Sequence, residues 1–359
     1  MSPQNPMSPQ NPPSPTTAEV EILPSRSSRR RDGVTKRRSR RRRRVLVALL
    51  IVVALLGSAV AAGALFVHDV VGGNLTTIAD DTAFPSGKRP AASTGAKNIL
   101  LIGSDSRRPD LEGRSGNQRA DTIMLLNVSA DRQHVAVMSI LRDLWVPVPG
   151  HGETKVNAAL AHGGTALLIE TLEDLLGARI DHVAIIDFAG LSAMTTALGG
   201  VVVDNPTPFT ASRGDDRFFA AGPITLEGER ALTFARERYA FSTGDYQRVT
   251  NQQLLLQGIV SRALSRDVLA DPASLVEFVR ETSRTVTVDA GFTLRESGAL
   301  AYSLRGADLK NFDFFTLPTG GTGMVGTQSI VKVDPAATSK VRAALAADTL
   351  ADYARGLAE

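Results

Sequence analysis

Short apolar runs alternate with segments of helical periodicity over most of the chain after residue 97. Apolar runs bounded by polar residues are typical of buried strands, whereas apolar positions at helical spacing are typical of helices that cover a core. The runs predict strands at 98–102, 121–128, 134–140, 182–186, 201–203, 284–288, 312–317 and 328–333. The helical spacing predicts helices at about 156–176, 188–198, 226–239, 245–264, 270–283 and 293–305, and a last one toward Glu359. This alternation predicts a layered α/β domain.

The first 67 residues have a different composition. Residues 1–44 are rich in Pro, Ser, Gln and Asn near the start, repeat MSPQNP twice, and end in RRRRR. Such a segment buries too little apolar surface to fold, so we expect it to be disordered. Residues 45–67 then run for 23 residues without a charge. As a helix this run spans roughly 34 Å, enough to cross a hydrocarbon core of about 30 Å.

A cleaved signal peptide is the alternative for residues 45–67, but its apolar region is usually only about 7–15 residues long. We therefore expect a transmembrane helix. The arginines before it predict a cytoplasmic N-terminus, with the rest of the chain outside the cell membrane. Residues 68–96 are expected to form a stalk, residues 97–340 an extracytoplasmic catalytic domain, and residues 341–359 a C-terminal helix or tail.

Composition narrows the chemistry of that domain. The formal net charge is +3, but residues 1–44 contribute +9 and the remaining residues −6. A domain of net negative charge repels nucleic-acid phosphates overall, so DNA binding is not indicated. The chain has no cysteine, which excludes disulfides, thiolate zinc sites and cysteine nucleophiles. The histidines are scattered, and His162 and His182 are expected to be core or surface residues rather than metal ligands.

The predicted strands gather charged residues at one edge of the sheet. If strand 121–128 runs antiparallel to both 98–102 and 134–140, the first and third strands end where the second begins. The charged residues at that edge are Asp105, Arg119, Asp121 and Arg142. The two carboxylates have three interpretations: they cap loops and pair with arginines, they form an acid/base pair, or they hold a hard cation such as Mg²⁺.

Two predicted helices, 226–239 and 245–264, bring further charged and polar residues to their ends. At helical spacing two arginines flank the apolar positions of the first helix, and three polar residues share one face of the second. These residues are Arg236, Arg238, Asp245, Arg248 and Gln252. Guanidinium groups suit phosphate oxygens, while ion pairs with Glu227, Glu229, Glu237 and Asp245 are the alternative. Together with the carboxylates they indicate a site for Mg²⁺ and pyrophosphate.

At these residues the chain resembles the LytR–CpsA–Psr (LCP) family of membrane-anchored enzymes of bacterial envelopes. The matching segments are LLIGSDSR (100–107), RADTIML (119–125), SILRD (139–143), KVNAALAHGG (155–164), IDFAGLSAMTTALGGV (186–201), LTFARER (232–238) and GDYQRVTNQQ (244–253). The resemblance implies a layered α-β-α domain with a central mixed sheet, behind one N-terminal transmembrane helix. The chain departs from the family pattern at Leu141, where proline is usual, and at Asn251, where arginine is usual.

The resemblance implies a phosphotransferase of cell wall assembly. It would move a glycopolymer from a polyprenyl-pyrophosphate carrier to peptidoglycan and leave a phosphodiester link. Asp105 and Asp121 would bind Mg²⁺ (or Mn²⁺), and Asp245 would either orient the arginines or act as the base. With Arg142 these aspartates form the expected catalytic set. The residues implied to bind the pyrophosphate are Arg119, Arg142, Lys155, Arg236, Arg238, Arg248 and Gln252.

The family also implies a hydrophobic tunnel for the lipid between the sheet and its helices, for which the apolar runs 166–176 and 253–260 are candidates. Two other functions stay open. One alternative is hydrolysis of the lipid-linked pyrophosphate, with water in place of the acceptor, and the other is binding of envelope polymer as a non-catalytic scaffold. Trp145, directly after SILRD, either packs the loop over the site or contacts sugar.

Overall fold

The computed structural model describes residues 75–92, 95–104, 120–214, 217–304 and 309–358. The expected disordered tail, the expected transmembrane helix and the first part of the expected stalk lie outside these residues, as do Asp105 and Arg119. Among the helices that the structure does describe, none is both long enough and apolar enough to span a bilayer.

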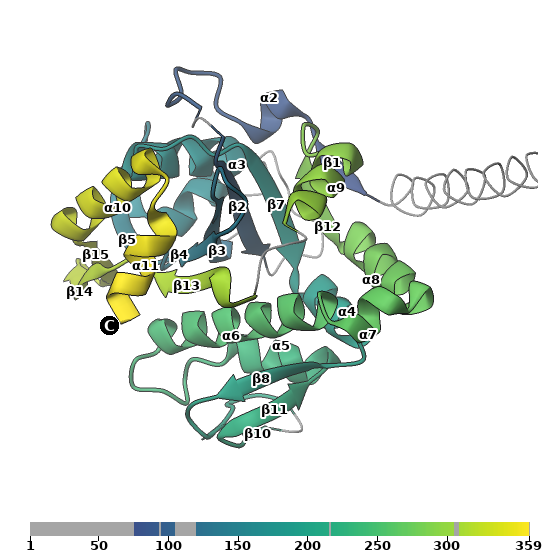
Figure 1. Cartoon of the computed structure of the whole chain (residues 1–359). Coiled ribbons are helices and arrows are strands. Elements are labelled where there is room, and N and C mark those ends of the chain that lie inside the picture. Colours follow the sequence, from purple (N-terminus) through teal and green to yellow (C-terminus); the bar gives the residue numbers. More distant parts are fainter. Residues whose placement is uncertain (1–74, 93–94, 105–119, 215–216, 305–308, 359) are drawn as a thin grey trace, which may run out of the picture. The chain divides into compact units, whose positions relative to one another are not determined.

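A mixed seven-stranded sheet forms the centre of the fold, in the order β1-β12-β7-β2-β3-β4-β13 (Figure 1). Its middle strands are rich in Ile, Leu, Val and Met and are buried along most of their length, as the apolar runs predict. In chain order the strands are β1 (Thr76–Ile78), β2 (Lys97–Ser104), β3 (Ala120–Val128), β4 (Val135–Ser139), β7 (His182–Asp187), β12 (Val286–Asp289) and β13 (Phe312–Thr316).

The strand directions decide where the charged residues meet. Strands β2 and β3 are antiparallel with Ile99 opposite Leu126, and β3 and β4 are antiparallel with Leu126 opposite Val137. Strand β7 runs parallel to β2. The C-terminal ends of β2, β4 and β7 and the start of β3 therefore share one edge, and this part of the predicted topology is confirmed.

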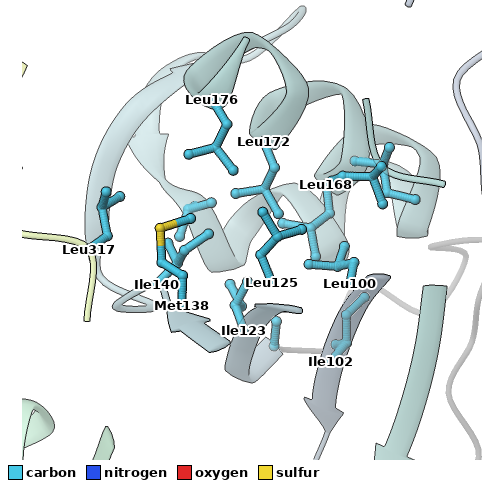
Figure 2. Packing of buried hydrophobic residues seen from close by; sticks show 14 of the residues in the cluster. Leu100, Ile102, Ile123, Leu125, Met138, Ile140, Leu168, Leu172, Leu176 and Leu317 are labelled. Carbon is cyan, nitrogen blue, oxygen red and sulfur yellow. The ribbon is translucent and has the colours of Figure 1, made fainter. Parts of the chain in front are cut away.

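Three helices cover one face of the sheet: α3 (Val156–Leu176), α10 (Pro335–Ala347) and α11 (Leu350–Ala358). Figure 2 shows the contact, where Leu168, Leu172 and Leu176 of α3 point at Leu100 and Leu125 of the sheet. All five side chains are at most 1% exposed. The apolar run 166–176 therefore fills the closed core, and the expectation that it lines a lipid tunnel is wrong.

The opposite face is covered by α6 (Asp245–Ala263) and α9 (Leu294–Ser303). Leu256 of α6 and Leu300 of α9 pack with Met124 and Val137 of the sheet. The three layers make an α-β-α sandwich around a mixed sheet, as the resemblance implied.

A smaller layer packs on the far side of α6 and contains four phenylalanines in mutual contact, Phe209, Phe219, Phe234 and Phe241. It consists of α4 (Phe188–Ala197), β8 (Val201–Asn205), β9 (Phe209–Thr210), β10 (Phe218–Phe219), β11 (Gly222–Leu226) and α5 (Gly228–Arg236). Because α6 lies between this layer and the main sheet, its side chains contact both (Figure 1).

A second sheet has the strand order β14-β15-β5-β6. Its strands are β5 (Leu144–Val148), β6 (Gly152–Lys155), β14 (Thr319–Val325) and β15 (Gln328–Val333). Its strand β5 begins at Leu144, two residues after Arg142 of the charged edge. The remaining described elements are α2 (Asp80–Ala83), α7 (Arg266–Ala270), α8 (Pro272–Thr285) and a short 3-10 helix (Leu309–Asn311).

Several expected elements differ from the structure. The helix expected at 226–239 spans only Gly228–Arg236, because Leu226 closes strand β11. The helix expected at 270–283 begins at Pro272, after the separate helix α7. The last helix is broken at Asp348, which has a left-handed φ of 58°. Strands β1, β5, β6, β9, β10, β11 and β14 were not predicted. Four of them (β1, β6, β9 and β10) have at most four residues, β5 and β11 contain proline, and β14 contains three glycines, so none carries a strong strand pattern.

We expect Leu168→Ala to lower the free energy of unfolding by about 2–5 kcal/mol, because it leaves a cavity where a side chain of 0% exposure filled the core. Chemical denaturation measures the change. Leu264→Ala is the matched control, since Leu264 is 47% exposed and should change stability by less than about 0.5 kcal/mol. Equal losses for the two variants would contradict the packing described here.

Candidate active site

Four segments bring charged side chains to the shared edge. Asp121 stands at the start of β3, and Arg142 follows β4 in a turn closed by the Leu144 N–H bonding to the Leu141 carbonyl at 3.0 Å. The chain after α5 supplies Arg238, and the first turns of α6 supply Asp245 and the residues that follow it. Residues over 120 positions apart in sequence thus meet because their strands and helices end at one place.

Arg142 is the centre of this cluster. Its Nη1 donates to Oδ1 of Asp121, and its Nε donates to Oδ2 of Asp245 at 2.9 Å. Asp143 lies at 3.9 Å from the same Nε. Burial would lower the pKa of Arg142, but the three carboxylates outweigh burial and raise it. The guanidinium is therefore permanently charged and is fixed in orientation by two side chains from different elements.

The carboxylate of Asp245 forms salt bridges with three arginines. Arg142 lies at 2.9 Å, Arg248 at 3.3 Å and Arg238 at 3.5 Å from its carboxylate oxygens. Burial would raise the pKa of Asp245, but the nearby Arg248, Arg142 and Arg238 hold it below its usual range. A carboxylate of lowered pKa is a weak proton acceptor at neutral pH, so the geometry favours orientation of the arginines over the role of base.

Arg248 and Gln252 lie one helical turn apart on α6 and are 6% and 8% exposed. Arg248 also donates to the Asp121 carbonyl at 3.3 Å, and its burial lowers its pKa. Nε of Arg248 and Oε1 of Gln252 are buried and have no hydrogen-bond partner within the described part of the chain. Buried polar atoms normally have partners, so these two groups point to a ligand.

Arg238 reaches the cluster for a reason other than the one predicted. Helical spacing placed it on a continuous helix, but α5 ends at Arg236 and Glu237 is extended, with a φ of −68° and a ψ of 132°. The Glu237 carboxylate accepts hydrogen bonds from the backbone N–H groups of Arg238, Tyr239 and Ala240 at 2.6–2.9 Å. This local hydrogen bonding ends the helix and turns Arg238 toward Asp245.

The other predicted residues are placed differently. Lys155 pairs with Asp143 at 3.0 Å and so joins the cluster only through that carboxylate. Arg236 is exposed and lines the same pocket as Arg238. Asp105 and Arg119 lie outside the described residues. Trp145 is half-buried on β5, directly opposite Lys155 of β6.

Two adjoining cavities open at this cluster. The first, of about 370 Å³, is polar and is lined by five arginines against three carboxylates. The arginines are Arg142, Arg213, Arg236, Arg238 and Arg248, and the carboxylates are Asp121, Glu229 and Glu237. Ser212 and Arg213 were not predicted, because the loop that holds them carries no motif. The excess of positive charge suits an anionic ligand.

The second cavity, of about 80 Å³, is apolar and lies between the sheet and helices α4, α5 and α6. It is lined mainly by Leu101, Met124, Ile186, Leu191, Leu255 and Leu256. Gln252 lines both cavities. Strand alternation places Asp121 in the polar cavity and the next residue, Thr122, in the apolar one.

A metal site is incomplete in the described part of the protein. Within those residues, no group of three or more His, Cys, Asp or Glu side chains is placed to hold an ion. Of the two expected metal ligands, Asp121 lies within the described residues. Nη1 of Arg142 donates to Oδ1 of Asp121, and within those residues no hydrogen bond to its Oδ2 is found. A single carboxylate is compatible with Mg²⁺, which commonly takes one or two together with phosphate oxygens and water.

Comparison with known proteins decides the family. The model of the LytR_cpsA_psr family matches residues 72–347. The chain belongs to this family. The matched range contains every described residue of the charged cluster.

Curated relatives come from several bacteria. A protein of Enterococcus faecalis named polyisoprenyl-teichoic acid–peptidoglycan teichoic acid transferase TagU is 33% identical over 206 residues, which are 57% of this chain and 65% of that protein. The cell wall biosynthesis protein LcpA of Corynebacterium glutamicum is 30% identical over 288 residues, covering 68% of this chain and 54% of that protein. The chain therefore spans about half to two thirds of the length of these relatives.

Solved structures share the fold. The crystal structure of Bacillus subtilis TagV superposes with a TM-score of 0.61 at 26% identity, covering 71% of this chain and 97% of that one. A LytR-Csp2A-Psr enzyme from Actinomyces oris gives 0.59 at 22% identity, covering 75% and 94%. A structure described as TagT bound to LI-WTA gives 0.58 at 21% identity, covering 74% and 98%.

We expect Glu237→Gln to destabilise the protein by about 1–3 kcal/mol at pH 7, because an amide cannot accept all the N–H groups that the carboxylate accepts. Burial would raise the pKa of Glu237, but hydrogen bonds from Ser212, Ala240 and Tyr239 outweigh it and lower the pKa. The stabilisation is therefore present above the unfolded-state pKa of about 4.3 and is lost as the pH falls through the lower folded-state value.

Denaturation of both proteins between pH 3 and pH 7 tests this expectation. The difference in stability between wild type and Glu237→Gln should shrink below about pH 4. Glu153→Gln, at an exposed position of β6, serves as the control and should leave the profile unchanged. A difference that stays constant down to pH 3 would show that the charge of Glu237 is not what the backbone N–H groups bind.

Proposed function

We propose that this protein is a phosphotransferase that moves a glycopolymer from a polyprenyl-pyrophosphate carrier to peptidoglycan, forming a phosphodiester link. The observation that carries the proposal is the position of Gln252, at the junction of an apolar cavity and a cavity rich in arginine. A ligand that fills both must have an apolar chain joined directly to an anionic group. A polyprenyl pyrophosphate has this construction.

The arginines have the roles that phosphoryl transfer requires. Arg142 and Arg248 are charged, largely buried and fixed by carboxylates, so they would meet the pyrophosphate with little reorganisation. Arg236, Arg238 and the unplaced Arg119 would complete the contacts. Gln252 would bind the phosphate next to the lipid. Lys155 would act through Asp143 rather than on the phosphate itself.

In the proposed reaction a hydroxyl of the peptidoglycan glycan attacks the phosphorus that carries the glycopolymer. The new P–O bond forms as the bond to the second phosphate breaks, and polyprenyl phosphate leaves with the electron pair. The hydroxyl proton passes to a base, for which Asp245 is poorly suited because its three arginine neighbours lower its pKa. Asp245 would instead hold Arg142, Arg238 and Arg248 in position.

A divalent cation, Mg²⁺ or Mn²⁺, belongs to the proposal. Asp121, together with Asp105, would hold it beside the pyrophosphate oxygens. When bound, it would act as a Lewis acid that neutralises the charge developing on the leaving phosphate. The Asp121 carboxylate is already oriented by Arg142, so an arginine and the cation would share this carboxylate.

The proposed location is the outer side of the cell membrane. The uncharged run 45–67 would be the single membrane helix, with the basic tail in the cytoplasm and the catalytic domain outside. This location would place the apolar cavity close to the lipid carrier. It also agrees with the names of the relatives, which refer to cell wall biosynthesis and to transfer onto peptidoglycan.

We expect Arg142→Ala to reduce kcat/KM for transfer by about 10²–10³-fold, the size found when one preorganised donor is removed from a charged transition state. The assay uses full-length protein in detergent, a synthetic polyprenyl-pyrophosphoryl oligosaccharide and isolated peptidoglycan. Arg280→Ala, which removes an arginine paired with Glu277 on α8, is the control and should retain activity.

The same assay separates the alternatives. Release of phospho-oligosaccharide that does not depend on added peptidoglycan would identify a hydrolase. Wild-type activity of Arg142→Ala, or complementation of a deletion strain by this variant in folded form, would reject catalysis at this site and favour a polymer-binding scaffold.

We expect chelation to abolish transfer and Mg²⁺ or Mn²⁺ to restore it. Independently of activity, Mg²⁺ added with a polyprenyl pyrophosphate should raise the Tm of the wild type, because a ligand that binds only the folded state stabilises it. This extra rise should be lost in Asp121→Asn but kept in Asp204→Asn, an exposed aspartate of β8. The same rise in Asp121→Asn as in the wild type would remove Asp121 from the metal site.

A further inference from the structure

A second hollow lies on the other side of α6, between this helix, the edge strand β13 and helix α11. Two cavities of about 310 and 550 Å³ meet there and share four residues, Leu254, Gln257, Phe312 and Phe314. We call this hollow the β13 groove. Thr250 and Asp313 line one of its ends, and Asp204 and Ser261 line the other.

The β13 groove is separate from the cavities of the candidate active site. At about 3.6 residues per turn, the α6 residues that line the apolar cavity and those that line the groove fall on roughly opposite faces of the helix. The first set includes Gln252 and Leu256, and the second includes Thr250, Leu254 and Gln257. A ligand in the groove is therefore a different molecule, or a distant part of a long one.

The lining has the character of a carbohydrate site. Phe312 and Phe314 alternate on β13, so both rings lie on the same face of the strand. The Gln257 amide and the Ser261 hydroxyl of α6 line the groove together with these rings. The amide Nε2 of Gln253 and the Thr250 hydroxyl already donate to the Phe315 and Tyr246 carbonyls, so they add only acceptors. Amides and hydroxyls both donate and accept hydrogen bonds, and aromatic rings pack on the C–H faces of sugar rings. Neutral sugars present both kinds of surface.

Charge in the groove disfavours an anionic polymer. Asp313 is paired with Arg355 of α11 at 3.2 Å, which leaves little net charge at that end. Asp204 is exposed at the other end and adds a negative charge. A chain of phosphodiesters would gain no attraction here, in contrast to the cavity that holds Arg142 and Arg248.

We infer that the β13 groove binds a neutral oligosaccharide, and that in the proposed function this is the glycan strand of the peptidoglycan acceptor. The inference deepens the proposed function and depends on it for the identity of the glycan. Binding there would hold the polymer while one of its hydroxyl groups reaches the pyrophosphate on the other side of α6. The groove thus selects the acceptor, and the arginine pocket selects the donor.

The test measures co-sedimentation of the full-length protein, in detergent, with peptidoglycan stripped of attached polymers. We expect Gln257→Ala and Phe314→Leu each to weaken binding at least tenfold. Leucine keeps apolar volume against the core while removing the ring. Gln328→Ala, an exposed glutamine of β15 outside the groove, is the matched control and should bind as the wild type does. Soluble N-acetylglucosamine oligomers should compete.

Each other outcome counts against the inference. Wild-type binding by both groove variants overturns it, as does competition by stem peptides but not by oligosaccharides. Near-UV circular dichroism and Tm identify a variant that has lost its fold, in which case Gln257→Ala alone decides. Binding of the polyprenyl-pyrophosphoryl donor, measured without peptidoglycan, should be unchanged in the groove variants. If Arg142→Ala retains full transfer activity, the proposed function fails, whatever the groove variants do.

Discussion

Arg142 held between Asp121 and Asp245 is the interaction on which the rest of the site depends. It joins the start of β3, the turn after β4 and the first turn of α6, three segments that no local interaction would bring together. A largely buried guanidinium costs too much to leave unpaired, so the two carboxylates fix its position. The same carboxylates reduce the electrostatic repulsion between the neighbouring arginines. The edge of the sheet can therefore carry several arginines at once.

The ion pairs also test the first interpretation of the carboxylates, in which they only cap loops and pair with arginines. In the described residues Asp121 and Asp245 do pair with arginines, as a purely structural role requires. That role leaves two observations unexplained, the buried unpaired atoms of Arg248 and Gln252 and the excess of arginine in the pocket. A bound pyrophosphate accounts for the Arg248 nitrogen and the charge, and a cavity for lipid next to it accounts for the apolar lining.

Helix α6 organises the functional surfaces more than any single strand. Its first turns carry Asp245 and Arg248, one face closes the apolar cavity through Leu256, and another face forms the β13 groove through Gln257. Gly258 lets it approach β8 closely, since a Cβ there would lie 2.8 Å from the Val202 carbonyl oxygen. Donor and acceptor would then be positioned by one rigid element.

The sequence by itself determined the order of most strands and helices, because hydrophobic period reflects which face of each segment is buried. It also predicted that Asp121 and Arg142 meet, since the short turn between β3 and β4 makes these two strands antiparallel. Tertiary structure alone decided that Glu237 ends α5 and turns Arg238 inward, and that the run 166–176 fills the core while α6 borders the cavity. The first outcome depends on which N–H groups the Glu237 carboxylate binds, those of Ser212 and of residues 238–240, and the second on packing between distant segments. A periodic pattern of apolar residues encodes neither.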